Sequence, residues 1–163
     1  MTRSLCAECG MCCDGTLFYS VTLQPGELPR SLTSLGLALR RKNGVTTLRQ
    51  PCPAHQNQGC CIYKNRPQRC RIFECQQIRR ISSGETSESE SRKIIQTTRQ
   101  RIAKIETMID RITETNPSRG LAQRCAVAVA NSPSTKLANE LTAAMNELQE
   151  ILKKEFRVPE ATR

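Results

Sequence analysis

The sequence has little of what nucleic-acid sites and membrane segments usually need. It contains no Trp, two Tyr and three Phe, although the net charge of its 163 residues is +10. Because aromatic rings supply most stacking platforms for bases, this shortage disfavours specific nucleic-acid binding. No apolar run approaches the roughly 20 residues of a membrane-spanning helix. The segment MTRSL leads into cysteine without the apolar stretch of an export signal, so we expect a cytoplasmic protein with no membrane partner.

The residue combinations of common enzyme classes are also missing. The sequence has no recognisable Ser/His/Asp set, phosphate-binding loop or nucleotide-binding fingerprint. Its single histidine, His55, is either a solvent-facing loop residue or a metal ligand or proton carrier. Whether the protein is an enzyme therefore stays open at the level of sequence.

Cysteine, in contrast, is abundant and confined to one half of the chain. Nine of the ten cysteines lie within residues 1–75, and only Cys125 lies outside. A reducing compartment opposes disulfides and favours metal thiolates or redox chemistry. A disulfide scaffold is the alternative, and it would require export. Cys125 lies among small apolar residues and is expected to be a buried thiol that packs like a small hydrophobe.

The densest group of cysteines is the segment RSLCAECGMCCDG. Cys6, Cys9 and Cys12 form a C-x2-C-x2-C pattern, in which a tight turn eased by Gly10 lets successive thiolates converge. Ferredoxin cluster loops begin with this spacing, and zinc knuckles share part of it. Cys13 follows directly, and neighbouring side chains diverge too far to reach one small ion without strain. The adjacent pair therefore indicates a polynuclear or split site.

A second group of cysteines lies in the segment PCPAHQNQGCCIYKNRPQRCRIFEC, residues 51–75. Together the two groups resemble the CxxCxxCC family of zinc- or iron-chelating domains, the YkgJ-like cysteine cluster proteins. The signature of that family is CxxCxxCC followed by a CP, a C-x-I-Y, an R-P-x-x-C-R and a closing cysteine. The matching residues are Cys6, Cys9, Cys12 and Cys13; Cys52-Pro53; Cys60 with Ile62-Tyr63; Arg66-Pro67, Cys70 and Arg71; and Cys75 after Phe73.

The resemblance implies eight metal ligands, at the cysteines of the family signature. They are Cys6, Cys9, Cys12, Cys13, Cys52, Cys60, Cys70 and Cys75. Cys61 falls on a variable position and is an additional thiol rather than an expected ligand. Eight thiolates suit two four-cysteine sites and favour zinc, iron–sulfur clusters or copper(I) over magnesium and calcium.

Some features of the sequence favour iron–sulfur clusters, and others favour zinc. The C-x2-C-x2-C start and the extra cysteine favour iron–sulfur clusters, which we prefer. The scarcity of apolar residues in the first half favours zinc, since structural zinc can supply about 10 to 16 kcal/mol of folding free energy.

Two functional classes are compatible with such sites. In the first, a cluster passes electrons or holds a substrate, which gives a redox or protein-modifying role. Some larger relatives of the family resemble protein-modifying enzymes such as flagellin lysine methylases. In the second, zinc is structural, and a basic surface or the helices bind a partner.

The charge of the chain bears on the choice of partner. Residues 1–82 hold 12 Lys or Arg against 4 Asp or Glu, whereas residues 83–163 hold 13 against 11. The arginines around Cys70 could tune a cluster or receive an acidic protein partner. The alternative is a solvated basic face that balances thiolate charge.

The sequence predicts a small α+β protein with two domains. Residues 1–82 are expected to form an irregular, metal-stabilised cysteine-rich domain, and residues 83–163 a helical tail. Within the first domain the patterns predict strands within 16–23 and 44–50, and a helix over 31–42.

Helical patterns dominate the second half of the chain. Isoleucines at steps of three and four residues, behind a Ser87–Glu90 capping box, predict a helix over about 88–114. The pairs Asn116-Pro117 and Ser132-Pro133 predict helices over about 117–130 and 133–156. We expect these helices to pack as a hairpin within the chain, and a coiled-coil homodimer is the alternative.

Overall fold

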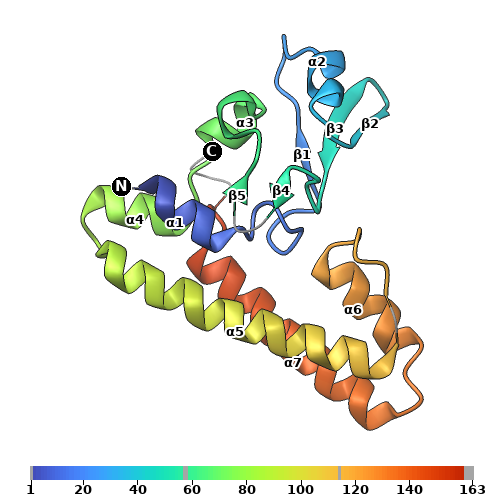
Figure 1. Cartoon of the computed structure of the whole chain (residues 1–163). Helices are drawn as coiled ribbons and strands as arrows, with labels where there is room; N and C mark the ends of the chain where they lie inside the picture. Colours follow the sequence, from blue (N-terminus) through green and yellow to red (C-terminus); the bar gives the residue numbers. More distant parts are fainter. Residues whose placement is uncertain (1, 57–58, 114, 160–163) are drawn as a thin grey trace. The chain divides into compact units, whose positions relative to one another are not determined.

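The computed structural model of the chain describes residues 2–56, 59–113 and 115–159 (Figure 1). It combines helices with two small antiparallel sheets, so the predicted α+β class is confirmed. The described residues divide into two compact units. The first unit holds Arg3–Phe73, and the second holds Thr2 and the chain from Glu74 onward. In the described part of the chain, no helix combines the length and the apolar character that crossing a membrane requires.

The helices and strands of the first unit are short. They are α1 (Thr2–Cys9), β1 (Ser20–Thr22), α2 (Pro29–Ser34), β2 (Leu39–Lys42), β3 (Val45–Arg49), β4 (His55–Gln56), β5 (Gly59–Cys60), the 3-10 helix η1 (Tyr63–Asn65) and α3 (Gln68–Ile72). The larger sheet has the antiparallel order β1-β3-β2, and β4 pairs with β5 in the smaller one.

The core beneath the larger sheet is small. Its buried residues are Leu32, Leu37, Leu48 and Ala54, and several cysteines pack against them. Leu48 of β3 lies opposite Val21 of β1 on one side and opposite Leu39 of β2 on the other. Leu5, Met11 and Leu17 of the same unit are also buried, outside this group. Because the elements of the unit are short, cross-links between them would add to its stability.

The predicted helix over 31–42 is wrong in its second half. The helix α2 ends at Ser34, and Gly36 at φ +83° turns the chain away from the helical path. Leu39 belongs to β2 because Asn43 (φ 49°) and Gly44 (φ 77°) fold β2 back onto β3 in a tight hairpin. The leucine spacing predicted one helix, whereas the leucines reach the same core from two elements.

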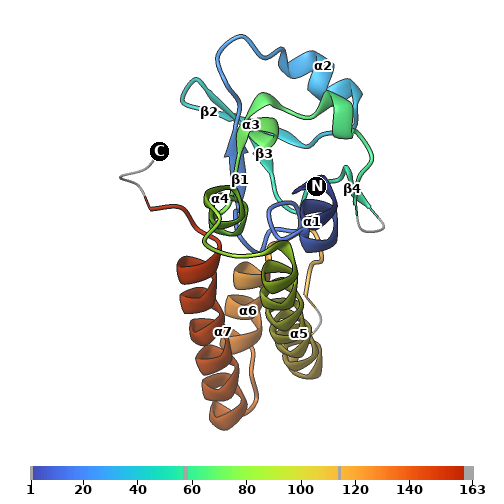
Figure 2. The same ribbon diagram turned by 90° about the vertical axis from the view of Figure 1, so that its left-hand side faces the viewer.

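The described residues of the second unit form the helices α4 (Gln76–Ser83), α5 (Glu88–Ile112), α6 (Leu121–Ala130) and α7 (Thr135–Glu155). Figures 1 and 2 show α5 and α7 side by side and antiparallel, with α6 against both. The predicted apolar face of α5 is confirmed, because Ile95, Ile102, Ile105 and Ile109 are all buried. The helices thus pack on one another within a chain, and a homodimer through them stays a prediction.

The starts of these helices follow from local hydrogen bonds. At α5 the capping box is confirmed: the Ser87 hydroxyl accepts the Glu90 N–H, and the Glu90 carboxylate accepts the Ser87 N–H at 2.8 Å. The helix α6 begins at Leu121, after the predicted start at residue 117. The reason is that the Asn116 side chain accepts the Ser118 N–H at 2.8 Å and closes a turn there. Ser134 caps α7 by accepting the Leu137 N–H.

Cys125 lies in α6 and is 5% exposed, which confirms the prediction of a buried thiol. Burial raises the pKa of this thiol. Polar contacts link the neighbouring helices around it, since Arg124 pairs with Glu106 at 3.1 Å and Arg101 pairs with Glu147.

The buried face of α5 gives a prediction for the helical unit. Ile109 is 0% exposed, and replacing it with Ala should destabilise the unit by about 2 to 5 kcal/mol through lost burial and a residual cavity. Urea unfolding followed by helical circular dichroism measures this change. The matched control is Leu137→Ala on α7, where the side chain is 39% exposed and the cost should stay below about 1 kcal/mol. Equal costs at the two positions would contradict the packing described.

Candidate metal centre

The first cysteine group is built on the end of α1. Cys6 and Cys9 are three residues apart on this helix, so they lie on one side of it. Gly10 at φ +61° then ends the helix, and its N–H donates to the carbonyl of Cys6 at 3.0 Å. The Cys13 N–H bonds back to the Gly10 carbonyl at 2.8 Å. This tight turn, which agrees with the expected role of Gly10, carries Cys12 and Cys13.

Four cysteines from separate segments of the first unit interact electrostatically. Burial, followed by repulsion from the other three sulfurs, raises the pKa of Cys13 to about 12. Burial and repulsion from neighbouring thiolates likewise raise the pKa of Cys70 to about 11. We call this set the four-thiol cluster; its members are Cys13, Cys52, Cys60 and Cys70.

Backbone hydrogen bonds fix the members of the four-thiol cluster. The Cys52 N–H donates to the carbonyl of Cys13 at 2.7 Å, which ties the first loop to the segment after β3. Burial raises the pKa of Cys52, but backbone hydrogen bonds from Ala54 and His55 act in the opposite direction. Cys60 lies on β5 directly opposite His55 of β4. Thiolates that accept backbone N–H groups in this way are typical of metal-binding turns.

Arg66 is the cation that lowers the pKa of Cys70. Its guanidinium stacks on the ring of Tyr63, 3.6 Å from the ring centroid. It opposes the burial and sulfur repulsion that raise the pKa of Cys70. Arg71 donates from Nε to the carbonyl of Arg66 at 2.8 Å. The motifs C-x-I-Y and R-P-x-x-C-R therefore supply one structure, a stacked arginine held beside a thiol.

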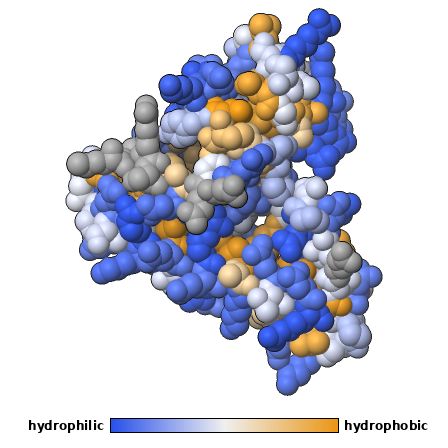
Figure 3. Space-filling model, viewed as in Figure 1, coloured by the Kyte–Doolittle hydropathy of each residue, from blue (hydrophilic) through white to orange (hydrophobic). Residues whose placement is uncertain are grey.

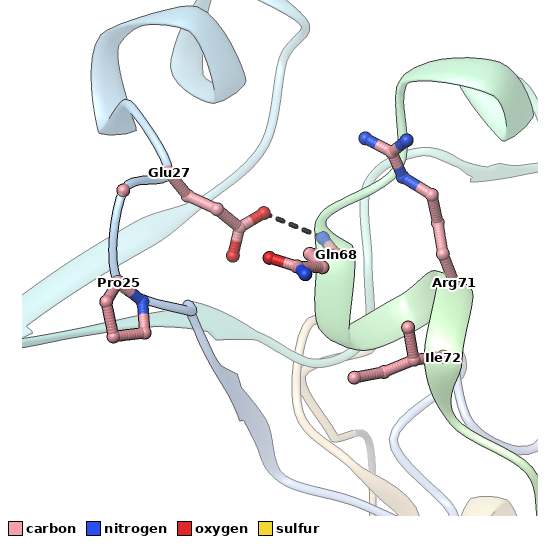
Figure 4. A pocket seen from close by; sticks show the side chains of 6 residues that line it. Pro25, Glu27, Gln68, Arg71 and Ile72 are labelled. Atoms are coloured by element: carbon pink, nitrogen blue, oxygen red, sulfur yellow. Dashed lines mark hydrogen bonds between the residues drawn. The ribbon is translucent and has the colours of Figure 1, made fainter.

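Glu27 was missed by the sequence reasoning. Its carboxylate accepts the Gln68 N–H at 2.7 Å (Figure 4). It also accepts the Gln24 N–H at 2.6 Å. It therefore ties the loop before α2 to the start of α3, the helix that carries Cys70. The bond lies in an open groove lined by Pro25, Gly26, Glu27, Gln68, Arg71 and Ile72. One signal was available, because Glu27 is the only acidic residue between Asp14 and Glu74.

This tether gives a prediction about the first unit. Glu27→Ala removes the acceptor of two backbone N–H groups and should destabilise the unit by about 1 to 3 kcal/mol. Hydrogen exchange at the amides of Gln24 and Gln68 should accelerate. Glu27→Gln is the matched control, since its amide oxygen keeps one acceptor and should recover part of the loss. Unchanged exchange at both amides in the Ala variant would contradict the tether.

The other four predicted ligands are placed differently. Cys6 is exposed, Cys9 is buried and Cys12 is half-buried. Cys75 belongs to the second unit and occupies the N-cap position of α4. Burial raises the pKa of Cys75, while backbone hydrogen bonds from Ile78 and Gln77 lower it. Four of the eight predicted ligands affect one another electrostatically, and the metal-binding role of all eight stays a prediction.

Two residues with open roles lie beside the four-thiol cluster. Cys61 is exposed, and its N–H donates to the carbonyl of Ala54 at 2.9 Å. His55 is half-buried in β4 and is therefore not the solvent-facing loop residue that was one of its two predicted states. Its Nε2 atom is buried and has no hydrogen-bond partner among the described residues.

The donor set fits a soft metal. All ten cysteines lie in the described part of the chain, and none is joined to another by a disulfide. Four half-buried thiols whose ionised forms repel one another would be stabilised by a cation, and thiolates select zinc, iron or copper(I). Within residues 2–56, 59–113 and 115–159, however, no group of three or more His, Cys, Asp or Glu is arranged so that it could hold a metal ion.

Comparison with known proteins identifies the family. The family model described as "CxxCxxCC: Putative zinc- or iron-chelating domain" matches residues 5–108. This range is more than half of the chain, and it extends beyond Cys75 through α4 and most of α5. No curated protein and no solved structure gives a significant match. The resemblance predicted from the cysteine spacing is confirmed, and the chain belongs to the CxxCxxCC family of zinc- or iron-chelating domains.

Proposed function

We propose that the protein binds iron–sulfur clusters through its eight family cysteines and uses them in a redox or protein-modifying role. The observation that carries this proposal is the four-thiol cluster, in which burial and sulfur repulsion raise the pKa of Cys13 to about 12. Such a set is costly to ionise without a cation and is stabilised when a cation is bound. A bound metal would draw the four sulfurs closer together.

The adjacent cysteines support more than one metal or a split site. Cys13 interacts electrostatically with Cys52, Cys60 and Cys70. Neighbouring side chains leave the backbone in different directions, so the side chain of Cys12 is expected to serve a different centre from that of Cys13. Two-cluster ferredoxins divide a cysteine run between centres in a comparable way.

A second candidate function is a structural zinc module that binds a partner. The small core of the first unit favours it, because a metal would then supply much of the folding free energy. The first unit also carries a large excess of basic residues, which suits an acidic protein partner. In this case the centre would be closed and would not exchange electrons.

Purification under anaerobic conditions, followed by elemental analysis and visible spectroscopy, separates the two candidates. Iron with acid-labile sulfide, and a visible absorption that bleaches on reduction, is the expected result. A colourless protein that contains zinc with four sulfurs per ion would establish the second candidate. A protein that retains neither metal after reconstitution would refute both.

The raised pKa values predict how metal binding depends on pH. In the metal-free protein Cys13 and Cys70, with pKa values of about 12 and about 11, are protonated at neutral pH, so a metal must displace their protons. The affinity for zinc should therefore rise with pH throughout the range below about pH 11, and zinc binding at the four-thiol cluster should release the protons of Cys13 and Cys70. Titration in weakly buffered solution measures the protons. Zinc binding without proton release would contradict a thiol site.

A further inference from the structure

The first unit contains a long stretch without negative charge. Residues 28–73 hold nine Lys or Arg and no Asp or Glu. Three of these cations are consecutive in β2, namely Arg40, Arg41 and Lys42, and all three are exposed. None of the three forms an ion pair with any described residue. Figure 3 colours the side of this unit that carries β2 and β3 as hydrophilic.

The strand β2 is also an edge of its sheet. In the order β1-β3-β2 it has one neighbour, and Figures 1 and 2 both show the β2–β3 hairpin at the periphery of its unit. The Arg49 N–H donates to the carbonyl of Ala38, which sets the alternation of hydrogen bonds along the pair. In this register the backbone N–H and C=O groups of Arg40 and Lys42 point towards β3. Leu39 and Arg41 direct their N–H and C=O groups to the outer edge.

We propose that the β2 edge binds an acidic protein segment in extended conformation. The segment would add as a further antiparallel or parallel strand and pair with the backbone of Leu39 and Arg41. Its acidic side chains would meet Arg40 and Lys42 on one face of the sheet and Arg41 on the other, since side chains alternate along a strand. Charge and backbone pairing therefore select the same partner.

The same features exclude other occupants. A second copy of this edge would bring three cations against three, which opposes self-association. A nucleic acid could neutralise the cations, but it cannot pair as a strand with the β2 backbone. The outward face of the sheet carries Ser20, Thr22, Thr47 and Val45 beside the cations and no aromatic ring on which a base could stack.

A labelled peptide of alternating Glu and Val tests the proposal by fluorescence anisotropy with the full-length protein. The wild type should bind it, and the variant R40Q/R41Q/K42Q should bind at least about tenfold more weakly, as expected for three exposed ion pairs. The matched control R30Q/K64Q/R69Q removes the same charge from exposed residues elsewhere in this unit and should change binding little. Circular dichroism shows whether each variant is folded.

Two further probes need only the wild-type protein. A peptide of alternating Lys and Val should not bind, and an acidic peptide with N-methylated backbone should lose most of its affinity, because it cannot donate to the strand edge. Equal weakening in the two triple variants would overturn the proposal and indicate general attraction between charges. Binding of a labelled oligonucleotide, but not of the acidic peptide, would overturn it in favour of nucleic acid.

Discussion

Replacing Cys13 by Ser should lower the metal bound per chain more than any single change outside the family cysteines. Burial and three neighbouring sulfurs raise the pKa of Cys13 to about 12, so a metal is the natural counter-charge at this position. A serine hydroxyl is a poor ligand for a soft cation and leaves an incomplete donor set. We expect the same direction of change for Ser at the other family cysteines, which are Cys6, Cys9, Cys12, Cys52, Cys60, Cys70 and Cys75.

Two cysteines of the same chain serve as matched controls. Cys61→Ser alters an exposed thiol on a variable family position, and Cys125→Ser alters a buried thiol of the helical unit. Neither should change the metal content, which elemental analysis of anaerobically purified variants measures directly. Full metal occupancy in the Cys13 variant would remove that residue from the ligand set. A loss in the Cys61 variant equal to that in Cys13 would mean that the family positions do not identify the ligands.

Removal of the metal should unfold the first unit while the helical unit keeps its structure. The sheet of the first unit packs on a small buried group, Leu32, Leu37, Leu48 and Ala54, whereas a structural metal can supply about 10 to 16 kcal/mol. The second unit has a continuous apolar face on α5 and α7, so it does not depend on a cation.

Hydrogen exchange before and after chelation tests this difference between the units. Amides of β1 and β3, such as those of Val21 and Leu48, should lose protection when a chelator is added. Amides of Ile105 and Leu148 in the helical unit act as the internal control and should keep theirs. Readdition of the metal should restore the first set. Persistent protection of Val21 and Leu48 in metal-free protein would show that the small core is sufficient.

The parts of the fold that were predicted correctly are those governed by local rules. The isoleucine spacing and the capping box of α5 depend on residues three and four apart, so the sequence shows both directly. The leucines of residues 31–42 gave a similar spacing, but the hairpin at Asn43 and Gly44 is a competing local signal. The hairpin forms in place of a longer helix because it also pairs β2 with β3.

The residues of the candidate site could be predicted from the sequence, but which of them lie near one another could not. Spacing and family resemblance gave the cysteines, but the association of Cys13 with Cys52 and Cys70 depends on how the loops close. The role of Glu27 depends on a contact with Gln68, 41 residues further along the chain. Contacts over such distances leave no periodic pattern, and only the isolation of Glu27 among basic residues pointed to it.

The capping position of Cys75 couples one thiol to a distant helix end. The helix α4 that begins there is fastened to the last turn of α7, because Gln77 donates to the Glu155 carbonyl at 2.9 Å and Arg80 pairs with the Glu155 carboxylate at 2.5 Å. Gln76 adds a backbone bond to Phe156 at 3.0 Å. A chemical event at that sulfur would thus be transmitted to the backbone at Phe156, 81 residues further along the chain.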